Sequence, residues 1–203
     1  MQAILDACAS GRIAAQVAVV IANVAGAQAL SRAQAAGVPA VLLPHKEFAS
    51  RDAYDAALVA ELRKHEVELV CLAGFMRLVT PVLLGAFPGR ILNIHPSLLP
   101  SFPGMHAVRQ ALAAGVRVAG CTVHVVDEGT DSGPVVIQAA VPVLEGDTEE
   151  SLAARILEQE HRIYPRAIQL FAQGRAAVEG RRVRVQGRPG DASRTLASPP
   201  LDD

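Results

Sequence analysis

Two polar side chains stand two residues apart at the end of a short apolar run, in the segment 90–104 (RILNIHPSLLPSFPG). The run predicts a strand, and alternation along a strand places Asn93 and His95 on the same face. Prolines follow His95 and exclude a helix, so the strand is expected to leave by a rigid loop. An amide beside an imidazole suits a carbonyl oxygen that becomes negative during a reaction, because both groups can donate hydrogen bonds to it.

A carboxylate would help chemistry of this kind, and Asp131 in the turn 127–133 (DEGTDSG) is the candidate. Close to His95, it would favour the protonated imidazole, which only donates hydrogen bonds. Each residue also has an ordinary interpretation, with Asn93 as a strand cap, His95 as a turn histidine and Asp131 as a turn aspartate. His124 lies in the middle of a predicted strand and is expected to be structural.

Strands and helices alternate through the first half of the chain. Continuous apolar or β-branched runs at 16–22, 39–43 and 67–73 predict buried strands. Apolar residues that recur at helical spacing predict helices at 27–36 and 51–66. This alternation indicates crossover connections and a parallel sheet.

The second half predicts a different arrangement. The pair Thr80-Pro81 predicts the capped start of a short helix. Residues 118–126 and 134–143 are expected to be strands joined as an antiparallel hairpin, and 151–173 a long helix. Residues 178–185 suggest a last hairpin. The expected fold class is therefore α/β, with a mostly parallel central sheet, helices on both faces and an antiparallel edge.

Composition sets limits on the architecture and on the partners. The chain has 203 residues, of which 51% are hydrophobic but only 3% aromatic, so its core must be aliphatic. This length predicts one domain, from residue 1 to 186, and the Pro, Gly, Ser and Asp content of 187–203 predicts a disordered tail. A formal net charge of −1 argues against nucleic-acid or anionic-membrane partners.

The cysteines indicate the cellular compartment, and the histidines argue against a metal site. Cys8, Cys71 and Cys121 are odd in number and set in apolar runs, which favours free thiols in a reducing cytoplasm. No segment reaches the length of a membrane span. The histidines are scattered, so no metal site is expected.

Four separated blocks, taken in order, carry a resemblance to a known family. They are LAGFMRLV (72–79), LNIHPSLLPSFPG (92–104), TDSGPVVIQAAVPV (130–143) and EQEHRIYP (158–165). With them the chain resembles the phosphoribosylglycinamide formyltransferases, from residue 1 to about 185. The resemblance implies a Rossmann-like formyltransferase fold. It also implies that the amine of phosphoribosylglycinamide attacks the formyl carbon of 10-formyltetrahydrofolate directly, in de novo purine biosynthesis.

The resemblance implies roles for individual residues. Asn93 and His95 would stabilise the oxyanion, while Asp131 would tune His95 and relay the proton that leaves the amine. Beside Asn93, the implied cofactor-binding residues are Arg51, Met76, Arg77, Leu78, Val79, Asp127, Glu128, Gly129, Thr130 and Asp131. The implied substrate-binding residues are Leu157, Glu158, Gln159 and Glu160, with Glu160 on the ribose hydroxyls and Leu157 giving a backbone contact or none. Small molecules are the implied partners, with no metal, and the implied oligomeric state is a monomer or weak homodimer.

One departure from the family concerns the start of the chain. The family begins with a strand and a glycine-rich, GNGSN-like loop whose backbone donors hold the ribonucleotide phosphate. This sequence opens after that point, at the helix that should follow the loop. We therefore expect residues 1–186 to be an N-terminally truncated formyltransferase domain, poorly soluble and weakly active until an N-terminal extension is added.

Other functions stay open at this stage. The chain is also compatible with an inactive folate-binding remnant that lacks the phosphate loop. Another formyltetrahydrofolate-using enzyme, such as the deformylase or methionyl-tRNA formyltransferase, is a further alternative. A purely structural α/β protein would have no use for Asn93, His95 and Asp131 together.

Overall fold

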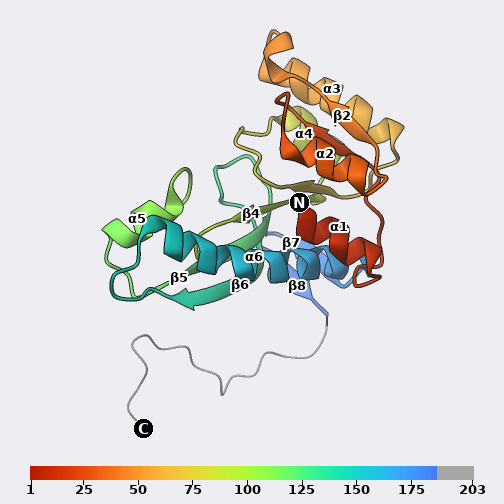
Figure 1. Ribbon diagram of the computed structural model, residues 1–203. Helices are drawn as coiled ribbons and strands as arrows, with labels where there is room; N and C mark the ends of the chain where they lie inside the picture. Colours follow the sequence, from red (N-terminus) through yellow and green to blue (C-terminus); the bar gives the residue numbers. More distant parts are fainter. Residues whose placement is uncertain (187–203) are drawn as a thin grey trace. The chain divides into compact units, whose positions relative to one another are not determined.

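The computed structural model describes residues 1–186 and has the mixed α/β architecture that the sequence predicts (Figure 1). The chain divides into two compact units, Met1–Leu92 and Asn93–Asp203. Parallel pairing occurs in the first unit and antiparallel pairing in the second. The predicted tail, 187–203, lies outside the described residues.

The first unit alternates helices with short strands. Its elements are α1 (Gln2–Ala9), β1 (Val20–Ala22), α2 (Gln28–Ala35), β2 (Ala40–Leu42), a 3-10 turn (His45–Glu47), α3 (Arg51–Lys64), β3 (Val70–Leu72) and α4 (Pro81–Ala86). Strands β1 and β2 pair in parallel, and α2 packs against both. The strand predicted at 16–22 is shorter in the structure, because only Val20–Ala22 pairs with β2.

Helix α3 packs against α4 in this unit. Ser50 caps α3 by accepting a hydrogen bond from the Ala53 amide. Thr80 occupies the N-cap position of α4, as predicted, but its hydroxyl makes no cap hydrogen bond. The buried carboxylate of Asp55 on α3 accepts the Thr80 backbone N–H instead, at 2.7 Å. The neighbouring helix therefore satisfies the backbone N–H of the N-cap residue, while the cap hydrogen bond expected of the Thr80 side chain is absent.

The second unit holds the antiparallel part of the fold. Its elements are β4 (Ile91–His95, which begins in the first unit beside β3), α5 (Ala107–Ala113), β5 (Val118–Val125), β6 (Val135–Pro142), α6 (Glu149–Ala172), β7 (Ala176–Glu179) and β8 (Arg182–Val185). Strand β5 lies between β4 and β6 and is antiparallel to β6. The two predicted hairpins, β5–β6 and β7–β8, are confirmed.

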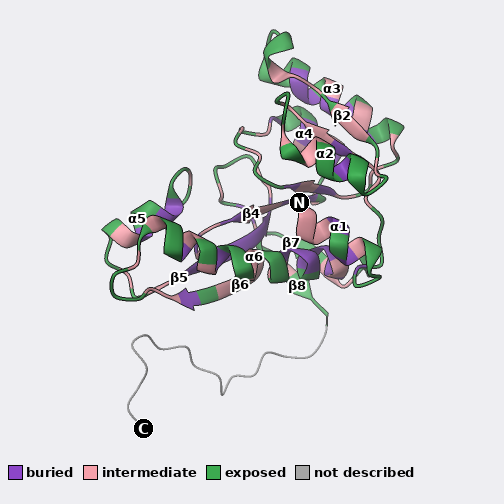
Figure 2. Ribbon diagram, viewed as in Figure 1, coloured by how far each residue is buried: buried purple, intermediate pink, exposed green. Residues whose placement is uncertain are grey.

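Helices α5 and α6 cover one face of the β5–β6 pair (Figures 1 and 2). The core between them is aliphatic, as the low aromatic content requires, and contains Val108, Ala111, Ala119, Cys121, Val141, Leu152 and Ile156. A capping box between Thr148 and Ser151 starts α6, and the helix continues through Pro165. No helix in the described part of the chain is long and apolar enough to cross a membrane.

Residues along β5 alternate between two environments, because successive side chains of a strand point to opposite faces. Cys121 belongs to the core under the helices, whereas Thr122 and His124 are buried polar residues that contact groups following or on β4. Gly120 has no room for a side chain, since a Cβ there would lie 2.0 Å from the Ala139 carbonyl oxygen and 2.9 Å from the Leu98 side chain. The loop after β4 therefore runs directly over this face of β5.

Candidate active site

His95, the last residue of β4, is 6% exposed and has an acceptor near each ring nitrogen. Its Nε2 lies 2.9 Å from the carbonyl oxygen of Phe102, and its Nδ1 lies 3.3 Å from Oδ2 of Asp131. A carbonyl oxygen can only accept, so Nε2 carries a hydrogen and donates a hydrogen bond to the Phe102 carbonyl oxygen. Nδ1 is thereby the nitrogen that faces the carboxylate.

The carboxylate of Asp131 is held from a second side. Oδ2 accepts the Gly104 backbone N–H at 2.8 Å, and Oδ1 lies 3.6 Å from Nε2 of His124. The backbone of Asp131 is left-handed, with φ +51°. The loop between β5 and β6 and the loop after β4 thus both contribute to the position of this acid.

His124 is the residue whose role the sequence interpretation missed. It is 2% exposed, and its Nε2 lies 3.2 Å from the Asn93 side-chain nitrogen. Burial lowers the pKa of His124, and the neighbouring His95 adds to this, while the Val125 carbonyl and Asp131 oppose it. A neutral His124 that donates from Nδ1 to the Val125 carbonyl oxygen, 3.2 Å away, can accept the Asn93 amide at Nε2. It therefore holds the Asn93 amide, and it lies next to the Asp131 carboxylate without a hydrogen bond to it.

The signal that could have identified His124 is its alternation with Thr122. The Thr122 hydroxyl donates to the Ser97 carbonyl oxygen at 2.7 Å and accepts the Leu99 amide at 3.0 Å. Gln138 on β6 donates to the same hydroxyl at 3.0 Å and to the Leu99 carbonyl oxygen at 2.8 Å. Two polar residues at alternating positions of an otherwise apolar strand mark the face that carries the loop after β4. The loop is fixed there by side chains, not only by its prolines.

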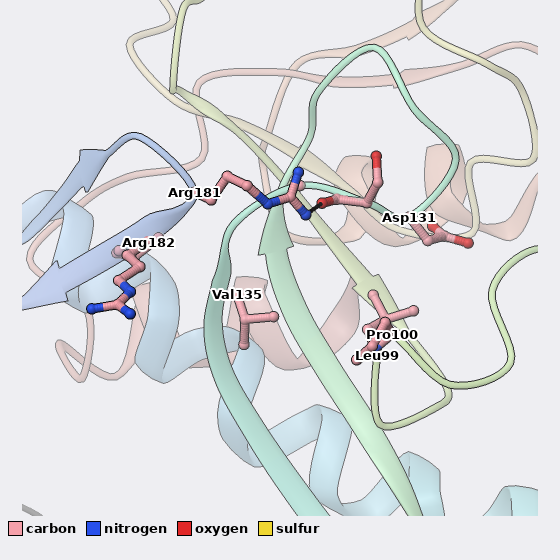
Figure 3. A pocket seen from close by; sticks show the side chains of 9 residues that line it. Leu99, Pro100, Asp131, Val135, Arg181 and Arg182 are labelled. Atoms are coloured by element: carbon pink, nitrogen blue, oxygen red, sulfur yellow. Dashed lines mark hydrogen bonds between the residues drawn. The ribbon is translucent and has the colours of Figure 1, made fainter.

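A pocket of about 370 Å³ opens beside Asp131 within the second unit (Figure 3). Its apolar lining comes from Leu99, Pro100, Val135 and Val183, and its basic lining from Arg181 and Arg182. Arg181 points toward the Asp131 loop and donates from Nη2 to the Ser132 carbonyl oxygen at 3.4 Å, whereas Arg182 points away (Figure 3).

The implied cofactor residues of the turn 127–130 form a compact structure. The Asp127 carboxylate accepts the Gly129 amide at 3.1 Å and the Ser132 hydroxyl at 2.7 Å through one oxygen. Glu128 and Thr130, in the same turn, are exposed to solvent.

The remaining implied cofactor residues, Arg51 and 76–79, belong to the first unit. Met76 and Leu78 are 76% and 55% exposed, while the alternate residues Arg77 and Val79 are partly buried. The Arg77 guanidinium lies over the Tyr54 ring of α3, 4.9 Å from its centroid. Arg51 is the exposed first residue of α3.

The implied substrate residues 157–160 lie on α6. Leu157 and Glu158 are exposed, and Gln159 accepts a hydrogen bond from Arg162 at 2.9 Å. Burial raises the pKa of Glu160. Burial also raises the pKa of the Cys121 thiol to about 12, and the charge of Glu160 adds to this.

The described residues, 1–186, contain no group of three or more histidine, cysteine, aspartate or glutamate side chains that could hold a metal ion. The cluster itself contains hydrogen-bond donors, one acid and a neutral imidazole. Such a set can stabilise a developing oxyanion and move a proton.

Comparison with known proteins relates this geometry to a family. The family model described as formyl transferase matches residues 1–168. The chain is 44% identical over 198 residues to the phosphoribosylglycinamide formyltransferase of Escherichia coli (strain K12), which covers 94% of this chain and 93% of that protein. A crystal structure of glycinamide ribonucleotide transformylase 1 from Symbiobacterium toebii has 61% identity and a TM-score of 0.90, over 92% of this chain and 88% of that one.

A longer relative matches as well. The trifunctional purine biosynthetic protein adenosine-3 of Drosophila pseudoobscura pseudoobscura is 48% identical over 176 residues, or 86% of this chain. The chain spans only 13% of the length of that relative. The match to the family model and the near full-length match to the bacterial enzyme together show that this chain belongs to the formyl transferase family, among the phosphoribosylglycinamide formyltransferases.

Proposed function

We propose that this chain transfers the formyl group of 10-formyltetrahydrofolate to the amine of 5′-phosphoribosylglycinamide, a step of de novo purine biosynthesis. The observation that carries the proposal is the buried cluster at the end of β4. In it, Asp131 lies 3.3 Å from His95 Nδ1, and the Asn93 amide is held by His124. Family membership supports the same reaction.

The proposed chemistry begins when the substrate amine attacks the formyl carbon and a C–N bond forms. The carbonyl oxygen becomes an oxyanion, to which Asn93 and His95 donate hydrogen bonds. His95 Nε2 already donates to the Phe102 carbonyl oxygen, at 2.9 Å. The charged oxyanion competes with that neutral carbonyl, because hydrogen bonds to ionised acceptors are about twice as strong.

The next proposed step breaks the bond between the formyl carbon and the folate nitrogen. The amine has become positively charged on attack and must lose a proton, which Asp131 accepts through His95 or through a water molecule. The departing folate nitrogen takes up a proton, so the charges balance. Direct transfer of this kind needs no covalent enzyme intermediate.

The binding roles are proposed residue by residue on the family pattern. Arg51, Met76–Val79 and the backbone of 127–131 would contact the folate, while Glu160 would accept hydrogen bonds from the ribose hydroxyls. The exposed apolar side chains of Met76 and Leu78 support a role in binding the folate ring system. A bound ring would cover apolar surface that otherwise faces water. We also propose that residues 1–186 act as one domain, in the cytoplasm, as a monomer or weak homodimer.

The test is a comparison of three reactions with the purified chain. Formylation of phosphoribosylglycinamide that depends on formyl folate would support the proposal, provided that Asp131→Asn abolishes it. Folate binding without turnover would support an inactive remnant instead. Release of formate without an amine acceptor would identify a deformylase.

A further inference from the structure

The loop between β5 and β6 is closed on itself by two side chains. The Ser132 hydroxyl donates to Oδ1 of Asp127 at 2.7 Å, and the Gly129 amide donates to the same oxygen at 3.1 Å. A Cβ at Gly129 would lie 2.1 Å from the Ser132 hydroxyl oxygen, so the loop folds tightly over this glycine. We call the Asp127–Ser132 contact the loop latch.

The latch lies next to the acid of the site. Asp131 directly precedes Ser132 and has φ +51°, a left-handed conformation that is unfavourable for a residue with a side chain. On the other side of Ser132, a Cβ at Gly133 would lie 1.8 Å from the Val125 carbonyl oxygen, so the chain is pressed against the end of β5. The surrounding loop must therefore maintain the strained backbone of Asp131, and the latch is the side-chain contact placed to do so.

A side chain from another part of the chain also binds this loop. Arg181, at the turn between β7 and β8, donates to the Ser132 carbonyl oxygen at 3.4 Å (Figure 3). Both contacts are exposed, but this bond is longer than the 2.7 Å latch, so it is expected to be weaker. Arg182 lines the same pocket but points away from the loop (Figure 3). The two adjacent arginines thus carry the same charge and line the same pocket, but only Arg181 contacts the loop.

We propose that Ser132 is a positioning residue for Asp131, acting through the latch to Asp127, and that Arg181 supports the same loop from the C-terminal hairpin. This inference rests on the proposed function, because it assigns the latch to the acid of the formyl transfer. The latch keeps the Asp131 carboxylate next to His95 Nδ1 and hydrogen-bonded to the Gly104 amide. Without it, the left-handed backbone relaxes and the carboxylate leaves both partners.

The kinetic test compares Ser132→Ala with Ser132→Thr. The alanine variant loses a hydrogen bond to a charged acceptor, so kcat is expected to fall about five- to tenfold. Threonine keeps the hydroxyl and should restore most of kcat. The KM for phosphoribosylglycinamide should stay unchanged in both variants, since its proposed ribose contact lies on α6. Equal losses in the two variants, or an alanine variant with the kcat of the unmodified chain, would overturn the proposal.

The contact that Arg181 makes with the loop is tested with a matched pair of variants, Arg181→Ala and Arg182→Ala. We expect kcat to fall about two- to threefold in the first variant only, because a hydrogen bond of 3.4 Å contributes less than the short latch to a carboxylate. Equal effects would point to the shared pocket charge and would remove Arg181 from the proposal.

A measurement without catalysis separates this inference from the proposed function. The Gly104 amide donates to Asp131 Oδ2, so its hydrogen-exchange rate reports the position of the carboxylate. Ser132→Ala should accelerate exchange at Gly104 and leave helix α6 unaffected, whereas Ser132→Thr should not accelerate it. Faster exchange in a chain without formyl transfer would support the latch while the proposed function fails. Unchanged exchange at Gly104 would overturn the latch, whatever the activity.

Discussion

Two loops contain most of the residues proposed to contact the folate: the loop between β5 and β6 and the loop after β3. The first is held by its own side chains, and the second by side chains of a neighbouring helix. The loop between β5 and β6 binds its own side chains, and its acid Asp131 is in contact with a histidine and a backbone amide. The loop that follows β3 in the first unit exposes Met76 and Leu78 to solvent. It is tied down by neighbours on α3, where Asp55 accepts the Thr80 amide and Tyr54 lies under Arg77.

This difference follows from what each kind of contact requires. An electrostatic group acts on a reaction only if it is fixed before the charge develops, so its position must be set by the protein. An apolar contact requires an accessible surface and tolerates some movement. The loop after β3 therefore suits binding, and the loop between β5 and β6 suits chemistry.

The largest expected effect comes from removing the acid of the fixed loop. Asp131→Asn keeps an oxygen that can accept the Gly104 amide but loses the charge that faces His95. We expect kcat to fall by about 10²- to 10⁴-fold, the usual contribution of a general acid–base group. Steady-state kinetics and a thermal melt would separate this effect from loss of the fold. A variant that melts normally and retains kcat within about threefold would remove Asp131 from the mechanism.

A smaller effect is expected where one buried side chain orients another. Asn93→Ala removes a donor to the oxyanion and should lower kcat by about 10²-fold or more. His124→Ala removes only the group that holds Asn93 and should lower kcat by about tenfold. The double variant tests whether the two act as a unit, because coupled residues are not additive. Additive losses in kcat would mean that His124 acts independently of Asn93.

The binding loop should respond differently. Tyr54→Phe keeps an aromatic face under the Arg77 guanidinium, whereas Tyr54→Leu does not. We expect the leucine variant to raise the KM for formyl folate about three- to fivefold, with little change in kcat, because a cation–π contact contributes roughly 0.5–1 kcal/mol. The phenylalanine variant is the control, since it keeps the buried volume of the ring. A fall in kcat with unchanged KM would contradict the division between the two loops.

The sequence predicted the elements better than it predicted the contacts between them. The hairpin around 127–133 followed from two β-rich segments and a turn, and the long helix expected at 151–173 is α6. Local patterns decide such features. The position of His124 depends instead on which side chain lies across from it on β4, a contact between residues 31 positions apart. The alternation of Thr122 with His124 marks a polar face of the strand, but it does not say which residue of β4 lies across from it.

Thr80 illustrates the same limit at a helix end. Its type and the proline after it correctly predicted the start of α4, and its side chain was expected to supply the cap. The Thr80 hydroxyl is instead buried without a hydrogen-bond partner, and the Thr80 backbone N–H is bound by Asp55, 25 residues earlier. This contact depends on the packing of α3 on α4, which the sequence does not reveal.

The smallest expected effect tests whether a carboxylate whose pKa is raised by burial lowers the stability of the fold, as an exposed carboxylate does not. Burial raises the pKa of Glu160, so the unfolded chain ionises at a lower pH than the folded one. This penalty is absent below the unfolded pKa of roughly 4.3 and grows as pH rises toward and through the folded pKa. Glu160→Gln should therefore raise the melting temperature at pH 7 and leave it nearly unchanged at pH 4. Glu158→Gln, on the exposed side of the same helix, removes an equal charge without the burial and should show no such pH dependence. If Glu160→Gln shifted the melting temperature equally at both pH values, its effect would come from packing, and the distinction between buried charge and exposed contact would not extend to α6.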